Sequence, residues 1–309
     1  MLGGAKRVSV ARHFKDAAAS RGLNLNVLSY ELSEEVPIAS EGRVIKGLRF
    51  SDAGVRDDLL RVIRSEGVDL VLPFVDPAVE VAAALRGATD AFVPVSDERL
   101  CRVMFDKSAA DDWFRLHSIP VPDRVALPLE GKVVLPIILK PRCGSASKGI
   151  TICRRESDIP AEIDAQTYMA QRYVADAEEV TADCYVDRAG RVLSVVPRIR
   201  LETAGGEVTR SITVRDQALI ALVRRVLDAG AFRGPVTVQL LRDRRNGQSL
   251  VMEVNPRLGG GVVTSIAAGS GILDMLIGET LGEQMDPVDD WRDHTLVARY
   301  LAEVVFTDC

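Results

Sequence analysis

The 309-residue sequence contains few of the residues from which several common functional sites are built. It has three histidines and five cysteines, and no two cysteines form a CxxC pair. An odd number of scattered cysteines fits neither a disulfide framework nor a zinc knuckle. The histidines His13, His117 and His294 stand in no arrangement typical of a catalytic triad. We therefore expect reduced thiols and histidines that are structural or exposed.

The sequence also lacks a long apolar run and an excess of positive charge. No stretch approaches the roughly 20 apolar residues of a membrane-spanning helix, and the opening MLGGAKRVSV lacks the apolar core of a signal peptide. The formal net charge is -5, which gives no general attraction to nucleic acid or to an anionic membrane. We expect a cytoplasmic protein whose partners are neither nucleic acids nor membranes.

The first hundred residues alternate between helical and strand-like patterns. Helical patterns cover about 5–21, 54–67 and 77–87, and apolar runs occupy 25–30, 68–74 and 91–95. This alternation predicts a parallel sheet covered by helices. Gly3 and Gly4 stand where the loop after a first strand would be, but no strand pattern precedes them. Either the start is late or the sheet is one strand short.

The pattern changes near residue 100. A helical pattern over 106–119 ends at Pro120 and Pro122 and is followed by a succession of strand-like runs with few helices. This succession predicts antiparallel sheet. The runs lie at 124–128, 133–141, 149–154, 167–174, 179–187 and 191–200. A helix over 216–229 then leads to a predicted hairpin of strands at 235–243 and 250–255.

The second strand of this hairpin carries polar residues at every other position. Glu253, Asn255 and Arg257 alternate with apolar residues, so they share one face of a strand. A three-residue loop ending in a left-handed Gly247 places Gln239 directly across from Glu253, whereas a two-residue loop turns Gln239 to the other face. The first register collects oxygen ligands suited to magnesium. A solvated face of an antiparallel sheet is the alternative.

A glycine-rich loop joins two strand patterns in ILKPRCGSASKGIT, residues 138–151. Lys140 ends the first strand, and Gly144 and Gly149 bracket small residues that let backbone N–H groups approach an anion. A Walker loop would lead into a helix. This segment is therefore either a phosphate-covering flap or an ordinary hairpin turn that contains lysines.

With these motifs in order along the chain, the sequence resembles the ATP-grasp superfamily, in particular its carbamoyl-phosphate-synthase large-chain-like branch. The resemblance implies a mixed fold: an N-terminal parallel α/β domain over 1–100, then an ATP-grasp domain over 101–309. The second domain would consist of two α+β subdomains with antiparallel sheets that clamp the nucleotide. Its lid would cover about 120–173.

The resemblance also implies a role for each matching residue. Lysines and the glycine-rich loop would bind the phosphates, the backbone of a hinge at 171–174 would bind adenine, and an acidic residue would bind the ribose. Glu178 competes with Glu179 for that last position. The nucleotide-binding residues would be Lys107, Lys140, Gly144, Ser145, Ala146, Ser147, Lys148, Gly149, Gln171, Arg172, Tyr173, Val174 and Glu179. The metal ligands would be Gln239, Glu253 and Asn255.

The implied reaction is an ATP-dependent carboxylate–amine ligation through an acyl phosphate. The cofactors would be ATP and one or two Mg²⁺ ions, with Mn²⁺ as a substitute, and the substrates a small carboxylate and an amine. Arg257, Lys140 and Arg210 would be catalytic. One of Arg198, Arg200 and Arg210 could hold a substrate carboxylate, and we prefer Arg210 because it follows a glycine-containing loop that could fold over the site; a solvated strand face is the alternative. The alternatives are a kinase or carbamoyl-phosphate-forming activity and a non-catalytic nucleotide-binding module. The resemblance makes a homodimer plausible.

Overall fold

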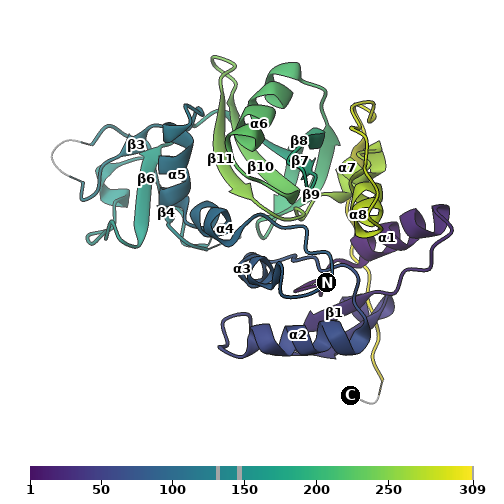
Figure 1. Cartoon of the computed structure of the whole chain (residues 1–309). Helices are drawn as coiled ribbons and strands as arrows, with labels where there is room; N and C mark the ends of the chain where they lie inside the picture. Colours follow the sequence, from purple (N-terminus) through teal and green to yellow (C-terminus); the bar gives the residue numbers. More distant parts are fainter. Residues whose placement is uncertain (130–132, 145–147, 308–309) are drawn as a thin grey trace.

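The computed structural model describes residues 1–129, 133–144 and 148–307. Within these residues the strands form three sheets, which have two, four and six strands. In Figure 1 the six-stranded sheet lies in the middle, the four-stranded sheet to its left and the N-terminal part below both. The mixed architecture with antiparallel sheets that the sequence predicts is therefore present, and the parallel part is present in a reduced form.

The N-terminal part is built on two parallel strands with helices around them. β1 (Leu28–Glu31) pairs in parallel with β2 (Arg43–Lys46). The helices follow the predicted ranges closely, and apolar residues from them, such as Leu59 and Ala82, form a common core. Their bounds are Val8–Ser20 for α1, Val55–Glu66 for α2 and Asp76–Leu85 for α3, and a short 3₁₀ helix covers Pro37–Ser40.

The first residues of the chain occupy the place of the first strand that the sequence does not show. Leu2 forms parallel bridges to both Tyr30 and Pro73. Its N–H donates to Leu72 O at 2.8 Å, and Phe74 N–H donates to Leu2 O at 2.9 Å. The two residues before the Gly3–Gly4 loop thus take the place of the strand, because Leu2 alone pairs with the chain on each side.

The apolar runs 68–74 and 91–95 do not become extended strands. Outside the bridges of Leu2, they are joined by a single parallel bridge between Leu70 and Phe92. Pro73 and Pro94 interrupt the runs and carry no N–H, so neither run offers a continuous row of donors to a ladder. The prediction of regular strands here is wrong, although the later part of each run, including Val71 and Val95, is buried.

The four-stranded sheet follows two helices, α4 (Glu98–Phe105) and α5 (Lys107–Leu116), of which only the second was predicted. Its strand order is β3-β6-β4-β5, and every pairing is antiparallel. Ile137, Leu139 and Ala170 form its small core. The strands are β3 (Arg124–Val125), β4 (Ile137–Pro141), β5 (Thr151–Cys153) and β6 (Tyr168–Arg172), with a 3₁₀ turn at Glu156–Asp158.

The six-stranded sheet is antiparallel throughout, with order β11-β10-β7-β8-β9-β12. On β7, even-numbered residues such as Ala182 and Cys184 pack with α6, and Tyr185 packs on the opposite face with α1 and α8. Both faces are thus covered by helices. The elements are β7 (Ala177–Val186), β8 (Val192–Ala204), β9 (Glu207–Thr213), α6 (Gln217–Ala229), β10 (Gly234–Asp243), β11 (Ser249–Asn255), α7 (Val263–Ala268), α8 (Ile272–Thr280) and β12 (Leu296–Ala298).

The loop of the β10–β11 hairpin is longer than predicted. Asp243 N–H donates to Gln248 O at 2.9 Å, and Gly247 N–H donates to Asp243 O at 2.8 Å. The loop is therefore 244–247, one residue more than the three-residue loop we expected. Gly247 does have the predicted left-handed conformation, with φ +73°.

A β-bulge compensates for the longer loop. Leu240 pairs with Val251, but Gln239 pairs with Glu253, so Met252 is the extra residue of β11. A bulge of this kind shifts the register by one residue. Gln239 consequently lies directly across from Glu253, which is the register that the sequence favours.

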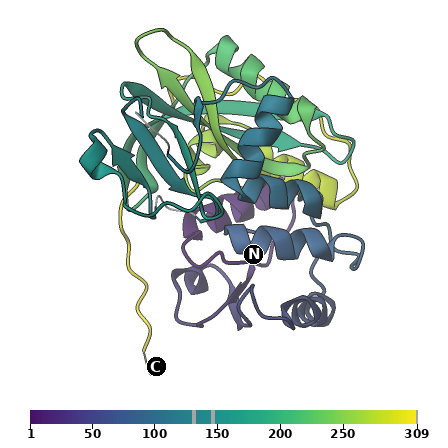
Figure 2. The same cartoon turned by 90° about the vertical axis from the view of Figure 1, so that its left-hand side faces the viewer.

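Two further features complete the fold. Within the residues that the structure describes, none of the helices combines the length and the apolarity needed to cross a membrane. The described segment after β12 forms no further strand, and in Figure 2 it extends away from the rest of the molecule. Tyr300, Leu301 and Val305 in this segment are exposed.

Candidate functional site

A cleft of about 790 Å³ lies between the four-stranded and six-stranded sheets, with the N-terminal part along one side. Arg7 and Asp76 come from that side, and Ile150 and Ile152 from the smaller sheet. Most of the predicted site residues line it. These are Lys107, Lys140, Gly144, Lys148, Gln171, Arg172, Tyr173, Val174, Glu179, Gln239, Glu253, Asn255 and Arg257.

Not every residue of the predicted loop can be placed in the cleft. Gly149 stands between two lining residues without lining the cleft itself. It has φ +73°, and an added Cβ would lie 2.9 Å from the Pro141 ring. Ser145, Ala146 and Ser147 lie outside the described residues.

Lys140 is held in the cleft by a chain of buried polar groups. Its Nζ donates to Gln171 Oε1 at 2.9 Å, and Gln171 Nε2 donates to Asp111 Oδ1 at 2.9 Å. Asp111 in turn accepts from Arg115 at 2.9 Å and from Arg124 at 2.8 Å. The direct partner of Lys140 is thus a neutral amide, and the carboxylate is one step removed. This arrangement fixes the lysine without neutralising it.

The environment of Lys140 disfavours its charge. The side chain is only 6% exposed, and this burial lowers the pKa of Lys140 to about 8, with Glu253 opposing the shift and Lys107 adding to it. Loss of hydration is the dominant cause, because a buried ammonium gives up its water shell. Glu253 therefore acts electrostatically on Lys140, as expected for groups that border one cleft.

The base of the glycine-rich loop is fastened to the start of α5. Lys107 N–H donates to Arg142 O at 2.8 Å, and Lys107 Nζ donates to Gly144 O at 2.7 Å. Asp106 caps α5 by accepting from Ser108 N–H at 2.9 Å, and it also pairs with Arg142 at 2.5 Å. Lys107 is consequently an anchor for the loop and a positive charge beside the cleft.

Strand alternation separates the two candidate ribose carboxylates. Glu179 lines the cleft and pairs with Arg200 at 2.9 Å. Glu178 pairs instead with Arg242 at 3.4 Å and Arg244 at 3.6 Å. Neighbouring strand residues point to opposite faces, so only Glu179 can reach a ligand in the cleft.

The polar face of the hairpin lines the opposite wall. Asn255 Nδ2 donates to Glu253 Oε1 at 2.9 Å, and Gln239 lies across from Glu253. One carboxylate and two amide oxygens fit a magnesium ion that also binds substrate phosphates. The described residues contain no group of three or more His, Cys, Asp or Glu side chains that could hold a metal, so the ion would depend on the nucleotide for further oxygen ligands.

Arg257 extends this wall and connects it to the N-terminal part. Its Nε and Nη2 contact Asp76 Oδ1 at 2.6 Å and 2.5 Å. Its Nη2 also lies 3.5 Å from Asn255 Oδ1. Asp76 is the first residue of α3, so the guanidinium is oriented from the other end of the chain.

Two further arginines line the cleft: Arg198, which the sequence offered as an alternative to Arg210, and Arg7, which it did not suggest. Arg198 is 2% exposed and donates from Nε to Asp183 Oδ2 at 2.8 Å, and Ser265 Oγ donates to the same oxygen at 2.6 Å. Gly261 lies so close that an added Cβ would be 2.7 Å from Arg198 Nη1. Arg7 lines the same end of the cleft. In the sequence, glycines were the signal that a close approach of the backbone occurs near these arginines: Gly3 and Gly4 for Arg7, and those at 259–261 for Arg198.

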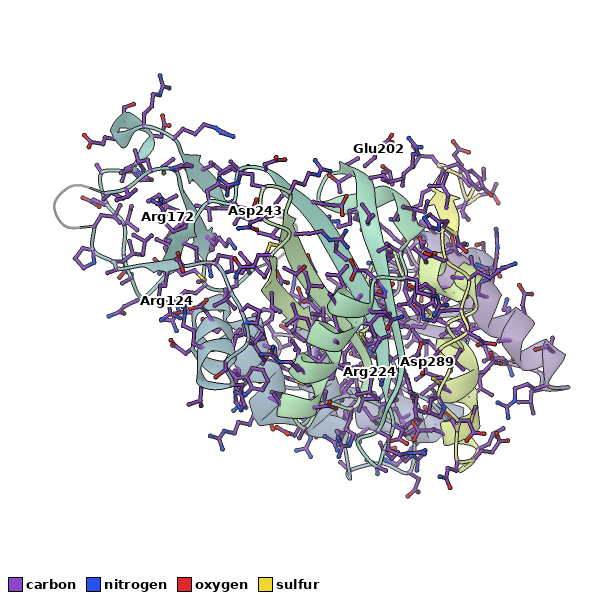
Figure 3. The ribbon with its side chains drawn as sticks, turned by 90° about the horizontal axis from the view of Figure 1, so that it is seen from above. Arg124, Arg172, Glu202, Arg224, Asp243 and Asp289 are labelled. Carbon is purple, nitrogen blue, oxygen red and sulfur yellow. The ribbon has the colours of Figure 1, made fainter. Side chains whose placement is uncertain are left out.

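The structure does not bring Arg210 into the cleft. Its guanidinium pairs with Glu202 instead, and Glu202 lies at the rim of the molecule in Figure 3. Ser211 bonds to Thr264 on α7 at 2.7 Å, so the preceding residue points to the opposite face of β9. Arg198 and Arg200, on β8, line the cleft in its place.

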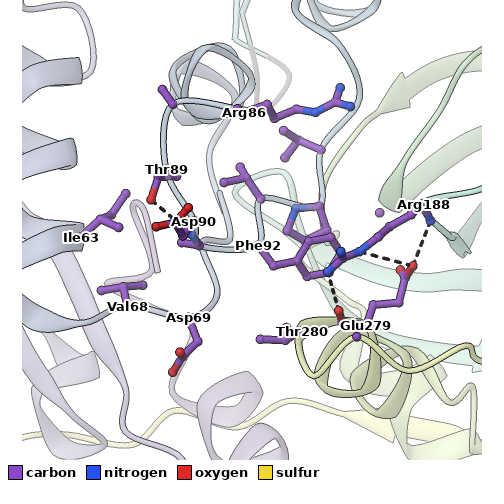
Figure 4. Close-up of a pocket in the computed structure, with 18 of the residues that line it drawn as sticks. Ile63, Val68, Asp69, Arg86, Thr89, Asp90, Phe92, Arg188, Glu279 and Thr280 are labelled. Carbon is purple, nitrogen blue, oxygen red and sulfur yellow. Dashed lines mark hydrogen bonds and ion pairs between the residues drawn. The ribbon is translucent and has the colours of Figure 1, made fainter.

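A larger cavity, of about 1210 Å³, lies elsewhere, between the N-terminal part and the end of α8. In Figure 4 Arg188 extends across the cavity between Phe92 and Glu279. Its guanidinium lies 4.1 Å from the centre of the Phe92 ring, and the backbone N–H of Arg188 donates to Glu279 Oε1 at 2.9 Å. None of the predicted nucleotide or metal residues lines this cavity. We therefore place the candidate site in the smaller cleft.

Comparison with known proteins gives one family match and a set of structures with a similar fold. Residues 164–302 match the family model described as ATP-grasp in the biosynthetic pathway with Ter operon. A search of curated proteins found no match. Among solved structures, the chain is similar to pyruvate carboxylase from Rhizobium etli with its allosteric activator acetyl coenzyme-A, at 19% identity and TM-score 0.74. The aligned region covers 94% of this chain and 30% of that one.

Two further structures are similar over most of this chain. One is the biotin carboxylase domain dimer of Hydrogenobacter thermophilus 2-oxoglutarate carboxylase with MgADP, ADP and bicarbonate, at 14% identity and TM-score 0.73, covering 93% of this chain and 71% of that one. The other is N5-carboxyaminoimidazole synthetase from Staphylococcus aureus with ADP, at 17% identity and TM-score 0.69, covering 93% and 77%. Residues 164–302 thus match an ATP-grasp family model, and most of the chain shares the fold of these structures.

Proposed function

We propose that the protein is an ATP- and magnesium-dependent ligase that activates a small carboxylate as an acyl phosphate for attack by an amine. The observation that carries this proposal is the cleft itself. Lys140 enters it from the smaller sheet, and Glu253 and Asn255 line it from the larger sheet. A triphosphate between the sheets would meet a cation on one wall and the ligands of its counter-ion on the other. The bound MgADP and ADP of the similar structures support this reading.

The nucleotide would lie along the cleft from the hinge to the hairpin. The backbone at 171–174 would contact adenine, Glu179 would accept from the ribose hydroxyls, and Lys140 and Lys107 would contact the phosphates. The loop at 142–149, including the predicted phosphate contacts at Ser145, Ala146 and Ser147, would cover them. Phosphoryl transfer requires mainly positioning and charge neutralisation, and these residues supply both without a nucleophilic side chain.

Gln239, Glu253 and Asn255 would hold Mg²⁺, or Mn²⁺ in its place. When bound, the ion supplies charge neutralisation at the transferred phosphoryl group. The single carboxylate gives this site a low negative charge, so the phosphates must contribute to binding. Arg257, oriented by Asp76, would contact the carboxylate that is activated.

The reaction has two balanced steps. A carboxylate oxygen attacks the γ-phosphorus and the bond to ADP breaks, which yields an acyl phosphate and ADP. The amine nitrogen then attacks the carbonyl carbon, phosphate leaves and the nitrogen loses a proton. An acyl phosphate hydrolyses readily in water, so a cleft that can exclude water protects it.

We also propose the boundaries 1–100 and 101–309 for two domains, with the smaller sheet at 120–173 as the lid, and a homodimer as the assembled state. The neighbouring biotin carboxylase domain is described as a dimer, which supports the last point. Sedimentation velocity would distinguish a monomer from a dimer.

A screen of paired carboxylates and amines for ADP release tests the proposed function. A productive pair should release ADP in proportion to amide product and only when magnesium is present. ADP release with a carboxylate alone would instead indicate a kinase-like activity. Nucleotide binding without ADP release from any pair would favour a non-catalytic module.

A further inference from the structure

Arg7 places an unpartnered guanidinium in the cleft. It lies far from the phosphate lysines in the sequence. It immediately precedes α1 and lines the cleft. Its Nη1 is buried and has no hydrogen-bond partner. Within the described part of the chain, no carboxylate lies within ion-pair distance of this side chain. Burial lowers the pKa of Arg7, with Glu207 opposing the shift and Arg257 and Arg299 adding to it.

The other arginines around Arg7 each have an acidic partner. Arg257 pairs with Asp76 at 2.5 Å, and Arg299 pairs with Glu207 at 3.0 Å. Glu207 therefore already forms an ion pair with Arg299 and not with Arg7. Arg7 adds one positive charge to this end of the cleft that the protein does not compensate. Burying an unpaired charge costs several kcal/mol in general, so a fold that retains one has a use for it.

A second buried guanidinium points to the same place. Arg198 is 2% exposed, and its Nη1 also has no partner. The glycine turn at 259–261 runs between the two arginines. An added Cβ on Gly261 would lie 2.7 Å from Arg198 Nη1, and one on Gly260 would lie 3.6 Å from Arg7 Nη1. Unused donors from two elements therefore border one stretch of side-chain-free backbone.

We infer that Arg7 and Arg198 form an anion subsite, which binds a carboxylate or phosphate group that a substrate carries in addition to its reacting group. Guanidinium groups suit both anions because they present several fixed donors. The residues of this subsite differ from the proposed phosphate contacts Lys140 and Lys107, which belong to the smaller sheet and to α5. Naming the ligand a substrate depends on the proposed function, whereas the anion binding itself does not.

Anion binding to the full-length chain without nucleotide tests this inference. Inorganic phosphate and malonate are the probes, measured by calorimetry and by the rise in Tm with anion concentration. We expect both to bind the unmodified protein, and the tighter of the two identifies the class of anion. Arg7→Gln should weaken binding at least tenfold. Lys6→Gln, which removes the same charge from the exposed neighbouring residue, should leave it unchanged.

Two further measurements separate this subsite from the nucleotide site. Lys140→Met should retain anion binding, and Arg7→Gln should bind ADP·Mg with unchanged affinity, which also shows that the variant is folded. The inference is overturned if the unmodified protein binds neither probe, if Arg7→Gln binds as well as Lys6→Gln, or if only Lys140→Met loses binding. Failure of the unmodified protein to bind ADP·Mg would refute the proposed function and leave the anion result intact.

Discussion

At the scale of single residues, Lys140 combines deep burial with a neutral hydrogen-bond partner. Its pKa is lowered to about 8 from the ordinary 10.5, a difference worth roughly 3 kcal/mol of unfavourable charge burial. An unfolded chain binds more protons than the folded one between these two values, so this lysine makes stability rise with pH across that window. Below it, the full cost of the buried charge remains. A negatively charged ligand that binds beside Lys140 would offset this cost.

We predict that ADP·Mg binding depends on pH through Lys140. Because the free lysine loses its proton above about pH 8, affinity should fall by up to about tenfold per pH unit beyond that point. Calorimetry between about pH 7 and pH 9.5 measures this slope. Lys140→Arg keeps its charge throughout this range and should give a flat profile. Equal slopes in the two proteins would show that another group titrates.

We also predict that Glu253→Ala abolishes magnesium-dependent ADP formation, lowering it roughly hundredfold or more because the only carboxylate of the proposed metal set is lost. Glu253 is half-buried on a polar wall and contributes to no apolar core, so Tm should change little. ADP release and circular dichroism measure the two effects. Glu178→Ala, which removes an acidic residue outside the cleft, is the control. Full activity in Glu253→Ala would refute the metal assignment.

Much of this residue-scale picture could be predicted from the sequence, but the partners could not. Alternation along a strand identified Glu253 and Asn255, because period two is a local property. Arg7 gave no such signal, since a lone arginine at a helix start is usually solvated. Arg7 becomes a candidate for anion binding only because it has no counter-ion, and only the folded structure reveals this.

At the scale of elements, the β10–β11 hairpin shows how two local irregularities can cancel. The loop has one residue more than expected, and the bulge at Met252 removes the offset. The register at Gln239 and Glu253 was therefore predicted correctly from an incorrect loop. No sequence pattern distinguishes a bulged strand from a regular one with a shorter loop. The requirement that polar residues share a face was the stronger constraint.

The glycine turn after β11 gives a prediction with a matched control. A Cβ on Gly261 would lie 2.4 Å from Val208 Cγ1 and 2.7 Å from Arg198 Nη1, whereas a Cβ on Gly260 meets nothing closer than 3.6 Å. Gly261→Ala should therefore displace Arg198 and lower ligase turnover at least tenfold, and Gly260→Ala should be nearly neutral. Turnover with a pair found in the substrate screen measures this. Similar losses in both variants would mean that the turn itself, and not the approach to Arg198, is required.

At the scale of the whole molecule, the cleft is assembled from distant parts of the chain. Arg7 precedes α1 and Asp76 begins α3, and α1 also shares a core with α8 and with Tyr185 of β7. The N-terminal part is consequently packed against the larger sheet. Its contribution to the site could not be predicted from periodicity, because contacts over such separations leave no local pattern.

The ion pair between Asp76 and Arg257 is the clearest of these long-range connections, and its side chains are 10% and 14% exposed. Removing one partner leaves the other charge largely buried, so Asp76→Ala should lower the free energy of unfolding by roughly 3 kcal/mol. Asp57→Ala, at an exposed first-turn position of α2, should cost less than about 1 kcal/mol.

Urea unfolding of both variants, and of Asp76→Ala combined with Arg257→Met, measures the coupling. The double variant should be more stable than the sum of the single effects, because it no longer leaves an uncompensated cation beside Arg7. Strict additivity would show that the pair does not couple the N-terminal part to the hairpin. In that case Arg257 would be oriented by Asn255 and the backbone alone, and Asp76→Ala would leave the ligase reaction unchanged.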